Sequence, residues 1–385
     1  MSDFRPLRGV VDFLYLTLMA NIGTPESRSI KWLLVSLLVG LIITSLIYFK
    51  DLLKPFVMAL MVWYLIKALT ILIGRIKIGG LPFPRWLCGA LSIVIIFGLI
   101  QGCINIIATN LAEMALNYTV YQEKLDLFLN EFGNLVGAKN IAESVKSHLG
   151  QIDVRGYLSS AISSLSTMIG TIVIVVIYII FLLLEEVTFS KKIDIIFTDA
   201  SQRDRVRRLM DEIFTATNKY ITLKTYVSLL TGVLSYVVLL LFGVDYAFLW
   251  AFIIFLLNYI PYIGSLVATL LPSFFAIVQF GSFWSFVWVF VSIELIQVVV
   301  GNYIEPKVMG KSLNLSPLIV MITLSFWGYV WDLLGMFLSV PITSIMLILM
   351  AQFPATRAVA IMLTEKGDID SLVIPKREET ESAIS

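Results

Sequence analysis

Charged residues are scarce in this chain of 385 residues, because Asp, Glu, Lys and Arg together make up only 14% of it and hydrophobic residues make up 58%. Soluble globular proteins usually contain about a quarter charged residues. The mean hydropathy of +0.91 points the same way. The shortage of charge excludes an ordinary soluble globular protein and indicates a polytopic membrane protein.

Cysteine and histidine are almost absent as well. The two cysteines, Cys88 and Cys103, lie in one apolar run at a spacing that matches no metal or redox motif, so we interpret them as packing residues. The single histidine, His148, lies in a polar stretch. We therefore expect neither a zinc site nor a cofactor. The net charge of +1 predicts no basic surface for nucleic acid, so no nucleic-acid partner is expected.

Apolar runs recur along the chain at lengths that suit membrane helices, which need about 17 to 25 residues to cross the hydrocarbon layer. Five runs are predicted to be single spans: 32–49, 55–73, 86–108, 167–184 and 226–242. Three longer or interrupted apolar blocks follow: 246–280, 283–304 and 315–353. We predict an all-α polytopic membrane protein with about eight membrane-embedded helices.

Lysine and arginine in the connecting segments predict the orientation, because short loops rich in these residues stay in the cytoplasm. Six parts result: an N-terminal arm with three spans (1–108), an extracytoplasmic amphipathic helical segment (109–166), a fourth span (167–184), cytoplasmic basic helices (185–225), a C-terminal transport core (226–353) and a cytoplasmic, largely disordered tail (354–385). Both termini are therefore expected in the cytoplasm. The first 29 residues contain no short apolar core with a cleavage site, so we expect no cleavable signal peptide.

The positions of lysine and arginine in the C-terminal half predict that two blocks, 246–280 and 315–353, each cross the membrane an even number of times and return to the side on which they begin. A straight helix over 315–353 would be about 57 Å long, nearly twice the thickness of the hydrocarbon layer. Both blocks are therefore predicted to be helical hairpins, either re-entrant or formed by two short spans. The second turn is expected at Asp332, which Gly328 and Gly335 flank.

The turn of the first hairpin is expected within the stretch LLNYIPYIGSLVATLLP, residues 256–272. Pro261 lacks an N–H and disrupts the preceding helical turn, while Gly264 permits a close backbone approach. The helix from Tyr246 should end near Tyr259, and a new one should begin after Gly264. Helix ends at membrane depth expose backbone groups that bind ions, and paired broken elements are typical of a transport site. A simple turn at the cytoplasmic surface is the alternative.

Glu294 lies in the middle of an apolar run, where an ionised carboxylate is costly. At 100° per residue, Glu294, Gln297, Gly301 and Glu305 share one face of a helix. This polar stripe must face protein or water. It indicates either a pathway for a cation, proton or solute, or interhelical hydrogen bonds that hold a bundle or an oligomer together.

Two stretches, residues 258–272 and 301–341, resemble the signatures of the AI-2E family of bacterial transporters, also called the PerM-like permeases. The general layout is similar over nearly the whole chain. The positions that correspond to the signatures are Pro261, Tyr262, Gly264, Pro272, Glu305, Pro306, Gly310, Pro317, Gly335 and Pro341. Ser265 replaces an expected proline, and Trp331 with Asp332 replaces glycine and apolar residues at the second turn. Because of these departures, the resemblance does not identify the ligand.

The resemblance implies a secondary transporter in the bacterial cytoplasmic (inner) membrane that exports a small molecule, the signal autoinducer-2 in the name-giving case. Sodium–proton antiport, as in other members, is the alternative, and a homo-oligomer such as a pentamer is implied. The residues predicted to form the pathway or the hairpin turns are Asn258, Pro261, Tyr262, Gly264, Pro272, Glu294, Gln297, Gly301, Asn302, Glu305, Pro306, Gly310, Gly328, Asp332, Gly335 and Pro341.

Other functions fit the sequence less well. An intramembrane enzyme needs a nucleophile with its base, or two facing aspartates, and the apolar spans contain neither arrangement. The stretch MGKSLN matches only the end of a phosphate-binding loop, because Glu305 occupies the position of its first glycine. A membrane scaffold that uses the two amphipathic segments for docking is less favoured than a transporter.

Overall fold

The computed structural model describes residues 25–75, 77–78, 81–82, 84–136, 140, 143–144, 146–147, 153–309 and 315–369. His148 and Gly310 lie outside the described residues. The chain divides into two compact units, residues 1–53 and residues 54–385. The described helix of the first unit is α2 (Pro25–Tyr48), and its apolar side chains from Leu33 onward are largely exposed, as a lipid-facing helix requires.

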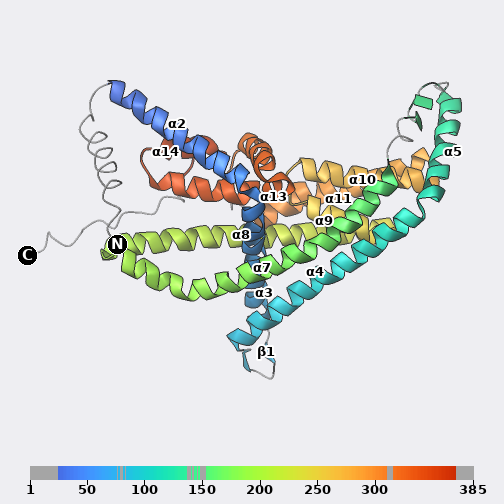
Figure 1. Cartoon of the computed structure of the whole chain (residues 1–385). Coiled ribbons are helices and arrows are strands. Elements are labelled where there is room, and N and C mark those ends of the chain that lie inside the picture. The colour runs from blue at the N-terminus through green and yellow to red at the C-terminus, as the bar shows by residue number, and fades with distance from the viewer. Residues whose placement is uncertain are drawn as a thin grey trace, which may run out of the picture. The chain divides into compact units, whose positions relative to one another are not determined.

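The second unit is helical apart from one small hairpin in its described part (Figure 1). Helix α3 (Lys50–Gly74) enters this unit at residue 54. The helices that follow are α4 (Arg85–Leu116), α5 (Tyr118–Val136), α7 (Val154–Ile196), α8 (Ala200–Leu241), α9 (Ala247–Leu257), α10 (Ile263–Phe280), α11 (Phe283–Val299), the π-helix η1 (Val300–Ile304), α12 (Glu305–Met309), α13 (Pro317–Gln352) and α14 (Arg357–Leu363). Strands β1 (Lys77–Ile78) and β2 (Leu81–Pro82) pair antiparallel.

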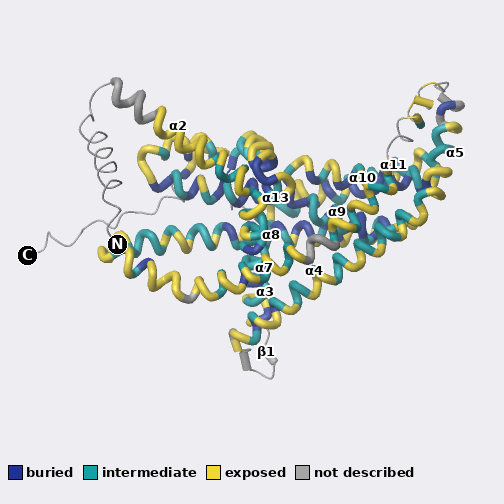
Figure 2. The backbone as a smooth tube through the Cα atoms, in the orientation of Figure 1, coloured by how far each residue is buried: buried dark blue, intermediate teal, exposed yellow. Residues whose placement is uncertain are grey.

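Seven helices in the described part of the chain are long and apolar enough to cross a membrane, and α9 and residues 33–48 of α2 are shorter apolar helices. The predicted all-α polytopic membrane fold is therefore confirmed. Figure 2 shows that buried residues gather on α8, α9, α10 and α13, whereas α4 and α7 are mostly exposed or intermediate. Most of the buried residues of the second unit thus lie in its C-terminal half, where the sequence predicts the transport core, and a smaller buried cluster joins α3 and α7.

Four boundaries of the predicted parts fall inside continuous helices. Residue 108 lies within α4, residues 166 and 184 lie within α7, and residue 225 lies within α8. An apolar run marks only the portion of a helix that suits the hydrocarbon layer, and the hydrogen-bonded backbone can continue into water beyond it. The assignment of these parts to sides of the membrane stays a prediction.

Helices α9 and α10 form the first hairpin. Helix α9 ends at Leu257, close to the expected end near Tyr259, and α10 begins at Ile263, so the expectation that the new helix starts after Gly264 is wrong by two residues. The turn closes through Tyr262, which has a φ of 59°. Gly264 then lies in the first turn of α10, where a Cβ would stand 1.9 Å from the Leu257 carbonyl oxygen. Glycine is needed here because the two backbones touch.

Helix α13 is the second hairpin, and its break lies at Trp331 and Asp332, where the sequence predicts it. A straight helix of this length would place its ends about 54 Å apart. The backbone N–H of Ser316 nevertheless donates to the Leu363 carbonyl at 3.0 Å. The eleven residue-to-residue steps from Gln352 to Leu363 could cover only about 39 Å even if fully extended, so α13 must fold back.

Two ion pairs attach α3 to other helices of the second unit. Lys54 lies 2.7 Å from the Asp332 carboxylate at the turn of α13. Lys67 lies 2.5 Å from Glu186 of α7 and 5.7 Å from the centre of the Trp63 ring. Lys67 therefore pairs within the protein, although its position near a predicted span end would also let it extend toward the membrane surface.

Helix α5 docks on the base of the α9–α10 hairpin through polar contacts. The Tyr121 hydroxyl donates to the Asp245 carboxylate at 2.9 Å, and Lys124 donates to the Gln279 carbonyl at 3.0 Å. Burial, with hydrogen bonds to Tyr246 and Asp245, raises the pKa of Tyr121, so its hydroxyl remains a donor. These contacts place α5 and the base of the hairpin at the same end of the molecule.

Candidate transport pathway

A pocket of about 450 Å³ lies between the turn of the first hairpin, the segment from α11 to α12, and the helices α8 and α13. It unites residues that are far apart in the sequence. Nine of the sixteen predicted pathway or turn residues line it: Asn258, Pro261, Tyr262, Glu294, Gln297, Gly301, Asn302, Glu305 and Pro306. The first hairpin turn and the polar face that begins at Glu294 therefore meet at one site.

The other predicted residues occupy different places. Five of them are buried inside the hairpin helices: Gly264, Pro272, Gly328, Gly335 and Pro341. Asp332 pairs with Lys54 and keeps 62% of its side chain exposed. Gly310 lies outside the described residues. The two turns therefore differ, because the first contributes to the pocket wall and the second makes an ion pair elsewhere.

A π-helix forms the part of the wall that precedes Pro306. Proline has no N–H and its ring collides with the carbonyl four residues earlier, which here belongs to Asn302. The backbone widens over Val300–Ile304, and the Glu305 N–H donates to the Val300 carbonyl. The Asn302 carbonyl consequently has no α-helical donor. Single π-turns of this kind are frequent at functional sites because they leave backbone groups available.

Lys224 of α8 is a charged pocket residue that the sequence analysis did not predict there. Its Nζ lies 2.5 Å from Glu305 Oε1, with 6% of the lysine and 24% of the glutamate side chain exposed. Positive charge placed Lys224 in the predicted cytoplasmic segment. The sequence nonetheless contains a pattern that indicates a polar face on this helix, because Lys224, Ser228, Thr231 and Ser235 are spaced to share one side of it. All four are buried.

The pocket lies far from the end of the molecule where α5 docks. Along α8, Lys224 is about 26 Å from the helix end at Leu241, at ~1.5 Å per residue. Along α11 and its continuation, Glu305 is about 33 Å from Phe283 by the same rise. These distances are close to the ~30 Å thickness of the hydrocarbon layer.

Two polar side chains of α11, Glu294 and Gln297, lie in the wall. Gln297 is 7% exposed, and its Nε2 has no hydrogen-bond partner. Glu294, one turn earlier on α11, is half-buried. A buried donor without a partner is costly, and most such groups in folded proteins are satisfied by protein, water or ligand. The Gln297 amide therefore points to a polar occupant of this pocket.

Replacing Gln297 tests whether that amide is kept for a ligand. We expect Gln297→Leu to raise the free energy of unfolding by about 1 kcal/mol, because it removes an unsatisfied buried group. Transport should fall by roughly tenfold, the equivalent of one lost hydrogen bond. The measurements are heat-induced unfolding in detergent and flux in reconstituted vesicles.

Gln279 is the matched control for this substitution. It is 8% exposed, its Nε2 donates to Gly243, and its Oε1 accepts from the Asp245 N–H. Gln279→Leu should therefore destabilise the protein by about 1 kcal/mol or more. If both variants lost stability, the Gln297 amide would have partners within the protein and would not serve a ligand.

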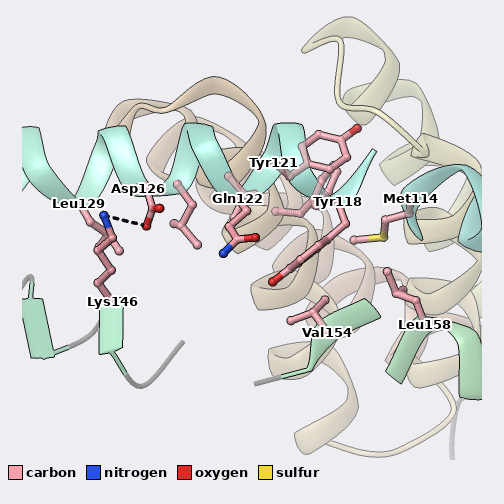
Figure 3. A pocket seen from close by; sticks show the side chains of 12 residues that line it. Met114, Tyr118, Tyr121, Gln122, Asp126, Leu129, Lys146, Val154 and Leu158 are labelled. Carbon is pink, nitrogen blue, oxygen red and sulfur yellow. Dashed lines mark ion pairs between the residues drawn. The ribbon is translucent and has the colours of Figure 1, made fainter. Parts of the chain in front are cut away.

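A second pocket, of about 270 Å³, lies between α5, α7 and α10 (Figure 3). Its wall is mostly apolar, and Met114, Val154 and Leu158 lie near Tyr118. Asp126 and Lys146 form an ion pair of 3.4 Å at one end. None of the predicted pathway residues lies among the described residues of its wall. We therefore place the candidate pathway at the larger pocket.

Residues 33–355 match the family described as AI-2E family transporter, which is most of the chain. The chain is a member of the AI-2E family. The matched range includes both hairpins, the π-helix and every residue of the candidate pathway wall. This confirms the family that the two signature stretches suggest.

Several relatives of this AI-2E family member have names that refer to transport. It is 30% identical to a putative transport protein of Haemophilus influenzae over 74% of this chain and 83% of the relative. It is 27% identical to the AI-2 transport protein TqsA of Escherichia coli over 84% of this chain and 93% of the relative. The putative transport protein YrrI of Bacillus subtilis is 24% identical over 84% and 95%. The chain is thus a multi-pass membrane transporter.

Proposed function

We propose that this transporter is a secondary exporter of a small molecule, an autoinducer-2-like signal or a related solute, and that ion gradients drive it. The observation that carries the proposal is the pocket where the first hairpin turn meets the Glu294 face. Secondary transporters bind their cargo where helices are interrupted within the membrane. The name of TqsA supports the choice of an autoinducer-2-like cargo.

The backbone around the pocket suits alternating access. Helix α9 is about 16 Å long and cannot cross the hydrocarbon layer by itself, so the hairpin turn ends at depth. The π-helix opposite it is a second interruption, and the Lys224–Glu305 pair connects that interruption to α8. A small rotation of α11 relative to the hairpin would therefore change access to the pocket without breaking a long helix.

Sodium–proton antiport is the second candidate, and Glu294 is the observation that favours it. This carboxylate lines the pocket and is half-buried, so it can bind either a proton or a cation. Asp332 suits this role less well, because it is largely exposed and pairs with Lys54. Under either candidate, Glu294 is the residue that would couple an ion to the transport cycle.

The setting of the protein is also part of the proposal. We place it in the bacterial cytoplasmic membrane with both termini in the cytoplasm, because lysine and arginine follow the expected bias. In this orientation α5 and the base of the first hairpin face outward, and the pocket extends from the hairpin turn toward the cytoplasmic edge. A homo-oligomer, of which a pentamer is one form, follows from the family resemblance and is tested by the mass of the purified complex.

Replacing the two acidic candidates separates coupled from uncoupled transport. We expect Glu294→Gln to abolish the response of transport to a pH or sodium gradient in reconstituted vesicles, since an amide cannot titrate. Asp332→Asn should retain that response, because Asp332 lies outside the pocket wall. The assay records vesicle pH, sodium and cargo efflux. Unchanged coupling in both variants would reject the antiport candidate, and absence of flux in the unaltered protein would reject transport through this pocket.

A further inference from the structure

The pocket wall has an unbalanced charge. Three of its described lining residues are lysine or glutamate: Lys224, Glu294 and Glu305. Lys224 and Glu305 neutralise each other at 2.5 Å. Glu294 lies about 16 Å further along the same helix from Glu305, beyond the reach of Lys224. One negative charge therefore remains in the wall, at Glu294.

Lys224 is poorly placed to attract an anion into the pocket. Its side chain is 6% exposed and already holds a carboxylate. An incoming anion would have to displace Glu305 and leave that group without its partner, which is unfavourable at low dielectric. Lys307, the next cation after Glu305, is exposed and is absent from the described wall. The pocket thus offers a negative charge to its ligand and no available positive one.

Glu294 and Gln297 define what a ligand of this pocket has to present. They are three residues apart on α11, so their Cβ atoms are about 5–6 Å apart on one face. The carboxylate accepts hydrogen bonds or binds a cation, and the unpartnered Nε2 of Gln297 donates. A matching solute carries a donor or cationic group next to an oxygen acceptor.

We propose that the pocket rejects anions and takes small solutes that place a cationic or hydrogen-bond-donating group at Glu294 and an acceptor oxygen at Gln297. This inference rests on the proposed function, because it assigns a substrate class to the same site. A low-dielectric cleft with a charge of one sign concentrates counter-ions, by about tenfold or more. The field of Glu294 should therefore act on any charged reagent that enters, whether or not it is transported.

A cysteine at Gly301 reports that field directly. Gly301 lines the pocket, and nothing lies within 4 Å of the position that its Cβ would occupy, so a cysteine fits. The native cysteines are first replaced as Cys88→Ala and Cys103→Ala. The full chain in detergent is then treated with methanethiosulfonates of similar size that carry a trimethylammonium, a hydroxyl or a sulfonate group. Gln202→Cys, at an exposed position of α8, supplies the reference reactivity of each reagent.

We expect the cationic reagent to react at Gly301→Cys roughly tenfold faster than the anionic one, after division by the rates at Gln202→Cys. Glu294→Gln should bring this ratio close to one, and Glu294→Asp should preserve it. Glu185→Gln removes a carboxylate on α7 outside the described wall and should leave the ratio unchanged. The neutral reagent should react at an intermediate rate if the pocket admits uncharged solutes, and as slowly as the anionic one if it takes cations only.

A ratio near one in the unaltered background, or a ratio that Glu294→Gln does not change, would overturn the inference. Because labelling in detergent requires no transport, that result would leave the proposed function intact. Conversely, a charge-selective pocket in a protein that shows no flux in vesicles would reject the proposed function and retain the site.

Discussion

Glu305→Gln should destabilise the protein by about 3 kcal/mol, because it leaves a nearly fully buried lysine without its counter-charge. Lys224 keeps only 6% of its side chain exposed, whereas Glu305 keeps 24%. Lys224→Gln should therefore cost roughly half as much, since the carboxylate that remains can still be hydrated. The measurement is the free energy of unfolding of each purified variant in the same detergent.

A double variant and a surface pair give the controls for this prediction. Lys224→Gln combined with Glu305→Gln removes both charges, so it should be less destabilising than Glu305→Gln alone. Glu185→Gln breaks the pair with Lys192, in which about half of each side chain is exposed, and should cost about 0.5 kcal/mol or less. Equal costs for Glu305→Gln and Glu185→Gln would show that the Lys224–Glu305 pair is hydrated and contributes little.

Gly264→Ala and Gly335→Ala are expected to have the second large effect, with a loss of about 3 kcal/mol for each. A Cβ at Gly264 would stand 1.9 Å from the Leu257 carbonyl oxygen, and one at Gly335 would stand 1.8 Å from the Trp327 carbonyl oxygen. Backbone atoms on both sides of each contact would have to separate. Both hairpins should therefore open, and the yield of folded protein and its unfolding temperature should fall together.

Gly301 of the π-helix and Gly328 of α13 provide matched controls. A Cβ at Gly301 meets nothing within 4 Å, so Gly301→Ala should be tolerated. A Cβ at Gly328 would meet the terminal methyl of Met336 at 2.9 Å, and that flexible side chain can move aside. Gly328→Ala should therefore lower the free energy of unfolding by less than about 1.5 kcal/mol, the usual limit for a tolerated substitution in a core. Similar losses for all four substitutions would contradict the assignment of backbone contact to Gly264 and Gly335.

The two hairpins reverse the direction of the chain in the same way. Each turn contains a residue other than glycine with a positive φ, 59° at Tyr262 and 54° at Asp332. A glycine follows within three residues and lets the returning helix touch the carbonyl of the helix before it. This arrangement costs local strain at each turn, and the packing of the paired helices has to offset it.

Much of this fold is readable from local pattern. Hydrophobic length predicts the spans, and parity of charge predicts that blocks 246–280 and 315–353 fold back, because both properties depend on neighbouring residues and on the thickness of a membrane. The helical period likewise predicts that Glu294, Gln297 and Gly301 lie on one face. The structure places all three in the wall of one pocket.

The partners of the charged residues were not readable in this way. Lys224 and Glu305 are 81 residues apart, and Lys54 and Asp332 are 278 apart. Such pairs form only when distant helices pack side by side, and a periodic pattern within one helix contains no information about its neighbour. The positive-inside bias assigns Lys224 to a cytoplasmic segment but does not indicate that its side chain is buried, because the bias counts charge without regard to packing.

The sequence by itself determines that this protein is an all-α membrane transporter of the AI-2E family, that its C-terminal half contains two hairpins, and which face of α11 is polar. The tertiary structure alone decides that only the first turn contributes to the pocket, that Lys224 completes its wall, and that Asp332 is paired elsewhere. The physical reason is the distance over which each property acts. Hydrophobicity, helical period and glycine contacts depend on residues within a few turns, whereas a pocket depends on how distant helices pack against one another.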